Sequence, residues 1–145
     1  MSLFSALSIS ASGMAAQRTR AELLTENLAN AETTRTPEGG PYRRKDVVFQ
    51  TESAGSPFAS VMNSALGAGT GGVAVSEILV DERDPEQRYM PGHPDAGANG
   101  YVAYPRVNPA EEMVDLMSAS NGYLANVASM SALKEMIQRS IDLLR

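Results

Sequence analysis

The sequence predicts a mainly α protein with a small β insertion: long helices at both ends form a coiled-coil-like assembly domain, and a short-stranded segment lies between them. Two observations predict this fold class. Apolar residues recur at heptad spacing at each end of the chain. The middle is rich in glycine, proline and small polar residues, and the chain has only 6% aromatic residues, which disfavours one large globular core. We expect residues 1–34 and 107–145 to form the assembly domain and residues 35–106 the middle segment.

Residues 3–31 are predicted to form the first helix. Its apolar residues recur at helical spacing, and a heptad row within it consists of Leu7, Met14, Ala21 and Leu28. The first dozen residues are rich in serine, which is a poor residue for a helix interior. We therefore expect this part to be frayed, or ordered only on assembly. The residues from Thr33 to Gly40 end the helix.

Asn27 and Asn30 lie near the predicted end of this helix. Asparagine is a middling helix former that prefers helix caps. The pair therefore indicates either a helix terminus or polar contacts that fix the register between helices. The sequence favours the two interpretations about equally.

The middle segment is predicted to contain three short strands. Residues 41–50, 73–81 and 100–104 have strand-like composition, and the first ends in the run VVFQ. Residues 53–72 are rich in glycine and serine and are predicted to form a flexible loop, with one helical turn near residues 58–66. Residues 82–99, rich in proline and charge, are predicted to form a loop. Three short strands make a small sheet or arm.

The last 38 residues are predicted to form one helix of about 36 residues, about 54 Å long at 1.5 Å per residue. Asn108 can cap it, Pro109 suits the first turn, and Glu111 has capping-box spacing. Gly122 is its only glycine, and we expect the helix to bend at Asn121–Gly122. Two heptad rows run along it: Leu116, Tyr123, Met130, Ile137 and Leu144, and Met113, Ser120, Val127, Lys134 and Ile141.

The length of this helix is the first indication of function. A compact protein of 145 residues would be roughly 40 Å across, so the helix would protrude with its apolar rows exposed. The small residues of the first helix cannot cover those rows completely; they are Ala6, Ala11, Gly13, Ala15 and Ala16. The sequence therefore predicts contacts with other subunits. The candidate assembly residues are Leu7, Met14, Leu24, Asn27, Leu28, Asn30, Met113, Leu116, Met117, Tyr123, Val127, Met130, Ile137 and Ile141.

Composition disfavours several other classes of protein. The net charge of −5 divides into +2 over residues 1–45 and −7 over residues 46–145, so the sequence offers no broad basic face for nucleic acid. The absence of cysteine excludes disulfides and cysteine-rich metal sites. The chain has no run of 18 apolar residues, so we expect no membrane-spanning segment. We also expect no cleaved signal peptide, because the N-terminus lacks a basic region and a continuous apolar region.

No motif predicts catalysis, a cofactor or a metal. Residues 67–72 (GAGTGG) match a dinucleotide-binding pattern, but a strand rather than a helix is predicted to follow. His93 is the only histidine, so a multi-histidine zinc site is excluded, and the prolines around it indicate a role in shaping a loop. Lys134 lies within an S-x-x-K match that lacks the companion motifs, and it is interpreted as a residue of the heptad seam whose charged end reaches solvent. We therefore assign no catalytic, cofactor-binding or metal-binding residue.

The two ends together resemble bacterial flagellar rod and hook proteins. The resemblance rests on SASGMAAQ at residues 10–17, NLANA at 27–31, PYRRKDVVFQ at 41–50, PGHPD at 91–95, GYVAYP at 100–105 and EMVDLM at 112–117. It covers nearly the whole chain except the glycine-rich stretch at residues 53–72, and it is greatest to proximal-rod members. The terminal motifs are specific when they occur as a pair.

The resemblance implies a structural subunit of the proximal rod, which polymerises into the axial drive shaft that transmits torque for motility. It further implies export through the flagellar type III apparatus without cleavage, and a location in the rod where it crosses the periplasm. The implied partners are other rod proteins, the MS ring and export-gate components, together with self-association. An alternative is a soluble helical adaptor of the flagellar export system. An enzyme is disfavoured, because no nucleophile–base or carboxylate constellation stands out.

Overall fold

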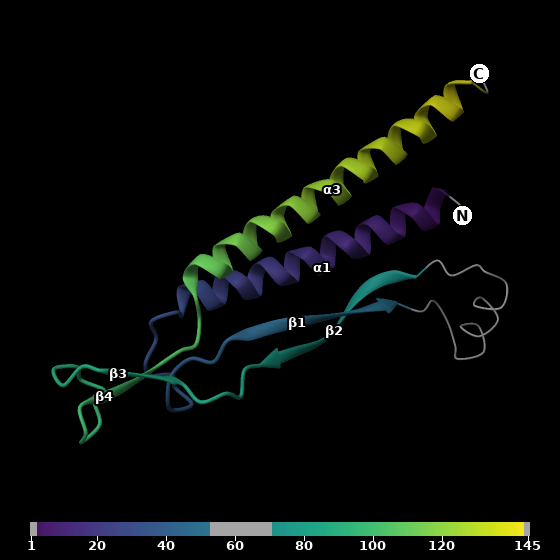
Figure 1. The fold of residues 1–145 in the computed structure, drawn as a ribbon. Helices are drawn as coiled ribbons and strands as arrows, with labels where there is room; N and C mark the ends of the chain where they lie inside the picture. The colour runs from purple at the N-terminus through teal and green to yellow at the C-terminus, as the bar shows by residue number, and fades with distance from the viewer. Residues whose placement is uncertain (1–2, 53–70, 144–145) are drawn as a thin grey trace, which may run out of the picture.

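The computed structural model describes residues 3–52 and 71–143, and it contains two long helices and two β-hairpins (Figure 1). The helices are α1 (Leu3–Ala29) and α3 (Pro109–Asp142). The described strands are β1 (Lys45–Glu52), β2 (Gly72–Val80), β3 (Glu86–Tyr89) and β4 (Tyr101–Tyr104). This confirms the predicted mainly α fold with a small β insertion.

Helix α1 is the central layer of the structure. It packs on α3 along one side and on β1 and β2 along another, whereas α3 packs on none of the described strands (Figure 1). The two helices run antiparallel, and the β3–β4 hairpin lies beyond the end where α3 begins. This arrangement explains why α1 contributes five buried residues and α3 only two within the described residues.

The β residues form two separate two-stranded antiparallel sheets, β1–β2 and β3–β4. Lys45 pairs with Val80 at one end of the first sheet and Glu52 with Gly72 at the other, with an irregularity in register between Val48 and Phe49. The second sheet pairs Glu86 with Tyr104 and Tyr89 with Tyr101.

Two strand predictions need correction. The first strand begins at Lys45 rather than at residue 41, because the backbone before it is bonded outside the sheet: the N–H of Tyr42 donates to the carbonyl of Thr33, in the segment after α1. The predicted loop at residues 82–99 contains strand β3, which the sequence did not reveal because all four of its side chains are exposed and lack apolar alternation. The strand predicted at 73–81 is confirmed as β2, and that at 100–104 as β4.

The serine-rich start of α1, predicted to be frayed or ordered only on assembly, is regular helix from Leu3 in this structure. Two of its hydroxyl groups form hydrogen bonds within the helix. The Ser8 hydroxyl donates to the carbonyl of Ser5 and the Ser12 hydroxyl to that of Ile9. Local bonds of this kind let serine occupy helix interiors without an unpaired hydroxyl.

Helix α3 begins and continues largely as predicted. The side chain of Asn108 caps it by accepting a hydrogen bond from the backbone N–H of Ala110 at 3.1 Å, and Pro109 occupies the first helical position. The helix runs through Asn121 and Gly122 as a single element of 34 residues. The predicted helical turn near residues 58–66 and most of the predicted loop at 53–72 lie outside the described residues, while Gly72 begins β2.

Candidate assembly surface

The contact between α1 and α3 includes small and polar residues at which the two helices approach closely. A Cβ atom added to Gly13 would lie 3.0 Å from the side-chain amide of Asn126, and one added to Gly122 would lie 3.2 Å from the side chain of Gln17. Arg20 forms an ion pair with Asp115 across the same contact, at 3.2 Å. The absence of side chains at Gly13 and Gly122 allows the two helices to approach closely there.

A buried polar cluster lies at the base of the helix pair. Asn27, with none of its surface exposed, uses all of its hydrogen-bonding capacity there. Its amide nitrogen donates to the carbonyl of Lys45 at 2.8 Å and to Glu112 at 3.1 Å. Its amide oxygen accepts from the N–H of Lys45 and from the hydroxyl of Tyr42, each at 2.9 Å. One asparagine therefore joins α1 to the start of β1 and to the first turn of α3.

Glu112 completes the polar cluster from α3. Its carboxylate is 1% exposed, and it accepts a hydrogen bond from Nε of Arg44 at 2.5 Å in addition to the one from Asn27. A buried carboxylate is stable only when paired and hydrogen-bonded, and both conditions hold here. Burial, together with the charges of Glu26 and Glu112, raises the pKa of Tyr42 to about 12. The cluster therefore holds Tyr42 neutral and Glu112 paired.

The two predicted asparagines have different roles, so both interpretations hold, one for each residue. Asn27 makes the polar contacts that fix the register between elements. Asn30 lies just beyond the end of α1, where its amide nitrogen donates to the carbonyl of Glu26 and its amide oxygen accepts from the hydroxyl of Thr33. Asn30 therefore terminates the helix.

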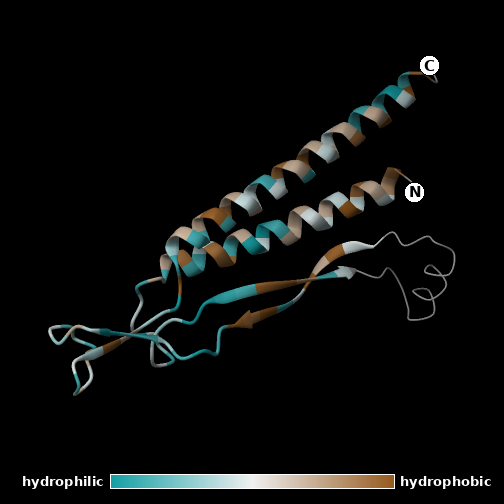
Figure 2. Cartoon of the chain, viewed as in Figure 1, coloured by the Kyte–Doolittle hydropathy of each residue, from teal (hydrophilic) through white to brown (hydrophobic). Residues whose placement is uncertain are grey.

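An apolar stripe lies along the exposed side of α3. Met113, Met117, Leu124 and Val127 are exposed by 53%, 67%, 59% and 36%. Together with Ser120 they are spaced alternately by four and three residues, which is the spacing of a coiled-coil seam. We call these five residues the outer stripe. Figure 2 shows that apolar residues recur along the whole length of α3, so the helix carries apolar surface that α1 does not cover.

The candidate assembly residues divide by exposure. Leu24 and Asn27 are buried. Half-buried are Leu7, Met14, Leu28 and Asn30 around α1, and Leu116, Met130 and Ile137 on α3. Exposed are Met113, Met117, Tyr123, Val127 and Ile141. The exposed residues on α3 are available to another subunit, and their role in assembly stays a prediction.

The sequence analysis missed several residues that organise this region. Glu112 was not singled out, because a glutamate in the first helical turn is ordinarily exposed. Tyr42 and Arg44 were read as part of a strand, yet they contribute to the polar cluster. Ala16 and Ala119 are buried between the elements, and Leu124 belongs to the outer stripe. The heptad spacing of Leu124 could have been noticed, whereas the partners of Glu112 have no local sequence signal.

The described residues offer no metal cluster of three or more histidine, cysteine, aspartate or glutamate side chains. In the same part of the chain, no helix is long and apolar enough to cross a membrane.

His93 lies in the turn between β3 and β4, where its Nδ1 accepts a hydrogen bond from the N–H of Asp95 and its ring packs edge-on against Tyr104. These contacts fit the predicted role of His93 in shaping that loop.

Comparison with known proteins identifies the family. A family model described as the flagellar basal body rod FlgEFG protein C-terminal region matches residues 98–143. The flagellar basal-body rod protein FlgC of Bacillus subtilis (strain 168) is 44% identical, with 99% of each chain covered. The FlgC chains of Borreliella burgdorferi and Escherichia coli O6:H1 are 38% and 39% identical, again over at least 98% of each chain. The chain belongs to the FlgC family of flagellar basal-body rod proteins.

Membership of the FlgC family accounts for the whole chain. The family-model match includes β4 and α3, while the FlgC relatives also cover α1 and the β1–β2 hairpin. The FlgC relatives are structural rod proteins, so the chain is a structural rod subunit of the flagellar basal body and the adaptor alternative is not favoured.

Proposed function

We propose that this rod subunit polymerises through the outer stripe of α3 and takes its place in the proximal part of the axial drive shaft. The observation that supports the proposal is the orientation of α3. Gly122 and Asn126 of α3 face α1, whereas Met113, Met117, Leu124 and Val127 remain exposed. A helix with a free heptad seam requires a partner helix.

The energetics favour burial of this stripe. Covering a large apolar side chain contributes about 1.5–3 kcal/mol, so several such residues along one helix outweigh a modest cost of ordering. From Leu116 to Leu133, α3 carries no charged residue, so no ion has to be desolvated when a second helix packs there. A contact between different faces of successive subunits builds a helical filament when its rotation does not close. These properties support a polymerising subunit.

We further propose other rod proteins, the MS ring and export-gate components as partners. The proposed route is export through the flagellar type III apparatus without cleavage, followed by incorporation into the rod where it crosses the periplasm. The resemblance to rod and hook proteins supports these proposals. The proposed partners can be tested by cross-linking in isolated basal bodies, and export without cleavage by comparing the mass of the incorporated chain with that of the full sequence.

The outer stripe can be tested with a matched pair of variants. Met117→Glu places a charge on the stripe, and Ser118→Glu places the same charge on the adjacent exposed residue, off the stripe. We expect Met117→Glu to abolish incorporation into isolated basal bodies and motility, and Ser118→Glu to retain both. The two purified monomers should unfold at the same urea concentration, because neither residue is buried. Normal incorporation of the Met117→Glu chain would overturn the proposal.

A further inference from the structure

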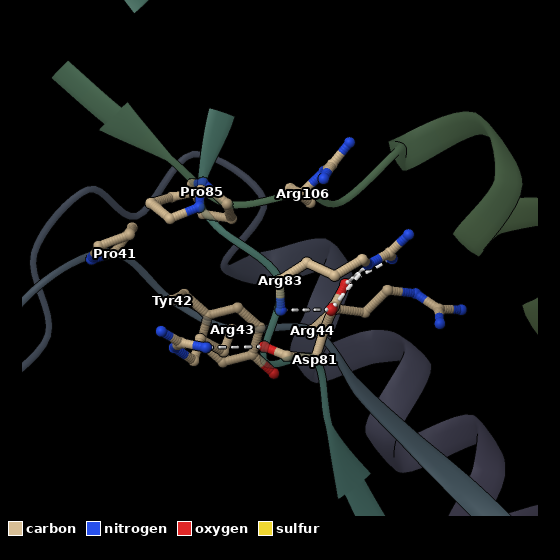
Figure 3. A pocket seen from close by; sticks show the side chains of 9 residues that line it. Pro41, Tyr42, Arg43, Arg44, Asp81, Arg83, Pro85 and Arg106 are labelled. Atoms are coloured by element: carbon tan, nitrogen blue, oxygen red, sulfur yellow. Dashed lines mark hydrogen bonds and ion pairs between the residues drawn. The ribbon is translucent and has the colours of Figure 1, made fainter. Parts of the chain in front are cut away.

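The small cavity in Figure 3 is lined by charged side chains that already bind within the chain. Its volume is about 40 Å³. The guanidinium of Arg83 donates to both carboxylate oxygens of Asp81, and that of Arg43 donates to the backbone carbonyl of Asp81 at 3.1 Å. Hydrogen bonds from Arg83 lower the pKa of Asp81 to about 2, so this carboxylate stays ionised and bound at neutral pH. A side chain that is not engaged in this way lies in the turn between β3 and β4.

Two asparagines of the chain are followed by glycine, and the structure places them in opposite surroundings. Asn99–Gly100 lies in the turn between β3 and β4, whereas Asn121–Gly122 lies inside α3. An asparagine before glycine can react with the backbone, because its amide carbon is an electrophile and glycine has no Cβ to hinder the approach of the backbone nitrogen. The same dipeptide therefore occurs once in a turn and once in a helix.

Asn99 is exposed in the tight turn of residues 97–100. The N–H of Gly100 donates to the carbonyl of Gly97 at 2.9 Å, and Gly100 has a φ of 76°. The side chain of Asn99 lines an open cavity of about 460 Å³, and within the described part of the chain it has no hydrogen-bond partner. Water therefore reaches the amide, and only one hydrogen bond of a surface turn has to break to free the Gly100 nitrogen.

Asn121 has the reactive dipeptide in a protected conformation. The N–H of Gly122 belongs to the hydrogen-bond ladder of α3, which runs as one helix from Pro109 to Asp142. Gly122 also packs on α1, where an added Cβ would lie 3.2 Å from the side chain of Gln17. The Gly122 nitrogen becomes available only when a turn of α3 opens, and such local opening costs free energy.

We propose that Asn99 is a site of spontaneous deamidation. The Gly100 nitrogen loses its proton to solvent and bonds to the side-chain carbonyl carbon of Asn99. The bond from that carbon to the amide nitrogen breaks, and the nitrogen takes up a proton and leaves as ammonia, so a cyclic imide forms. Water then adds to one of the two imide carbonyls and opens the ring. Opening at one carbonyl gives aspartate, and opening at the other gives isoaspartate, in which the chain continues through the side-chain carbon. The net change exchanges ammonia for water, without oxidation or reduction.

The modification alters the end of the β3–β4 hairpin. Isoaspartate adds a carboxylate and lengthens the backbone next to Gly100, whose carbonyl accepts a hydrogen bond from the N–H of Met90 at 2.9 Å. The turn has little room for a shift, because a Cβ added to Gly100 would lie 2.9 Å from the ring of Tyr89. The amide proton of Met90 should therefore exchange with solvent faster in the modified chain. The hairpin lies beyond the end where α3 begins, so this chemistry is independent of the proposed polymerisation.

The test incubates the purified full-length chain at physiological temperature and mildly alkaline pH, which favours loss of the Gly100 proton. Trypsin separates the two sites, because Asn99 lies in the peptide 89–106 and Asn121 in the peptide 107–134. Mass spectrometry follows the conversion of amide to acid at each residue, and an isoaspartyl methyltransferase assay detects isoaspartate. We expect Asn99 to react at least about tenfold faster than Asn121, because α3 has to open before Asn121 can react.

Matched variants and the unfolded chain serve as controls. Asn99→Gln should abolish the modification of peptide 89–106, whereas Asn121→Gln should leave it unchanged. Asn99→Gln should unfold at the same urea concentration as the unaltered chain, because Asn99 is exposed. In guanidinium chloride the two sites should react at similar rates, since unfolding removes the protection by α3. Equal rates in the folded chain would overturn the inference. So would an unmodified Asn99 in the folded chain over a period in which the unfolded chain reacts.

Discussion

Asn27 of α1 and Glu112 of α3 are hydrogen-bonded to each other, 3.1 Å apart between Nδ2 and Oε2, and at most 1% of either residue is exposed. This single contact joins residues 85 positions apart in the chain. Two strongly polar side chains can be buried between the helices because this contact, the bonds of Asn27 to Lys45 and Tyr42, and that of Arg44 to Glu112 satisfy their polar atoms.

Replacement of Asn27 by alanine is expected to destabilise the protein by on the order of 3 kcal/mol, because it leaves several buried polar groups without partners. Those groups are the backbone of Lys45, the hydroxyl of Tyr42 and one oxygen of Glu112. Asn30→Ala is the control and should cost about 1 kcal/mol, since it removes only bonds at the helix end. Urea unfolding measures both. Equal losses would contradict the role assigned to Asn27.

Replacement of Glu112 by glutamine is expected to cost on the order of 3 kcal/mol, because the guanidinium of Arg44 loses its buried counter-charge. Glu111→Gln changes the neighbouring, exposed carboxylate and should change stability by less than about 0.5 kcal/mol. The comparison uses thermal unfolding of the two variants under identical conditions. A Glu111→Gln variant as unstable as Glu112→Gln would show that the cost arises from the helix dipole and not from the buried pair.

Replacement of Tyr42 by phenylalanine is expected to cost about 1 kcal/mol at neutral pH, through loss of the hydrogen bond to Asn27. It should also remove part of the alkaline dependence of stability. The folded pKa of Tyr42 is raised to about 12, above the unfolded value of about 10. The stabilisation is therefore complete below pH about 10 and is lost as the pH rises towards 12. Unfolding free energies measured across this range should fall less steeply for the variant.

Gly122→Ala and Gly13→Ala should differ although both exchange glycine for alanine within a helix. The exchange itself favours the helix by about 1 kcal/mol. At position 122 the added methyl group meets Gln17, whose flexible side chain can move, so we expect no loss or a small gain in stability. At position 13 it meets the amide of Asn126, which donates to the carbonyl of Gly122 and is held in place. We therefore expect Gly13→Ala to be the less stable variant in calorimetry.

The long helices could be predicted from sequence because their signals are local. Heptad spacing and the cap at Asn108 each lie within a few turns of the residues that they organise. Strand β3 was missed because exposed charged residues give no alternation, and it forms only by pairing with β4. The early start predicted for β1 has a related cause. Tyr42 and Arg44 lie in a run of strand-like composition, but their side chains form hydrogen bonds within the polar cluster.

The candidate surface was predicted in part. Both heptad rows of α3 were visible, but the sequence could not say which row faces α1. That choice depends on how Gly13 and Gln17 of α1 fit against Asn126 and Gly122 of α3, a fit of shapes that has no local pattern. The polar cluster could not be predicted either, because its members come from three separated segments.

The central position of α1 has a consequence for the order in which the chain acquires its structure. The first helix to be synthesised packs on the last, so the helix pair cannot close until the C-terminal quarter of the chain is available. Until then Asn27 lacks its partner Glu112, and the face of α1 that packs on α3 stays exposed. Contacts so distant in sequence form slowly, because a long loop has to close first. The topology therefore leaves α1 without α3 during synthesis, so the helix pair is among the last contacts of the chain to form.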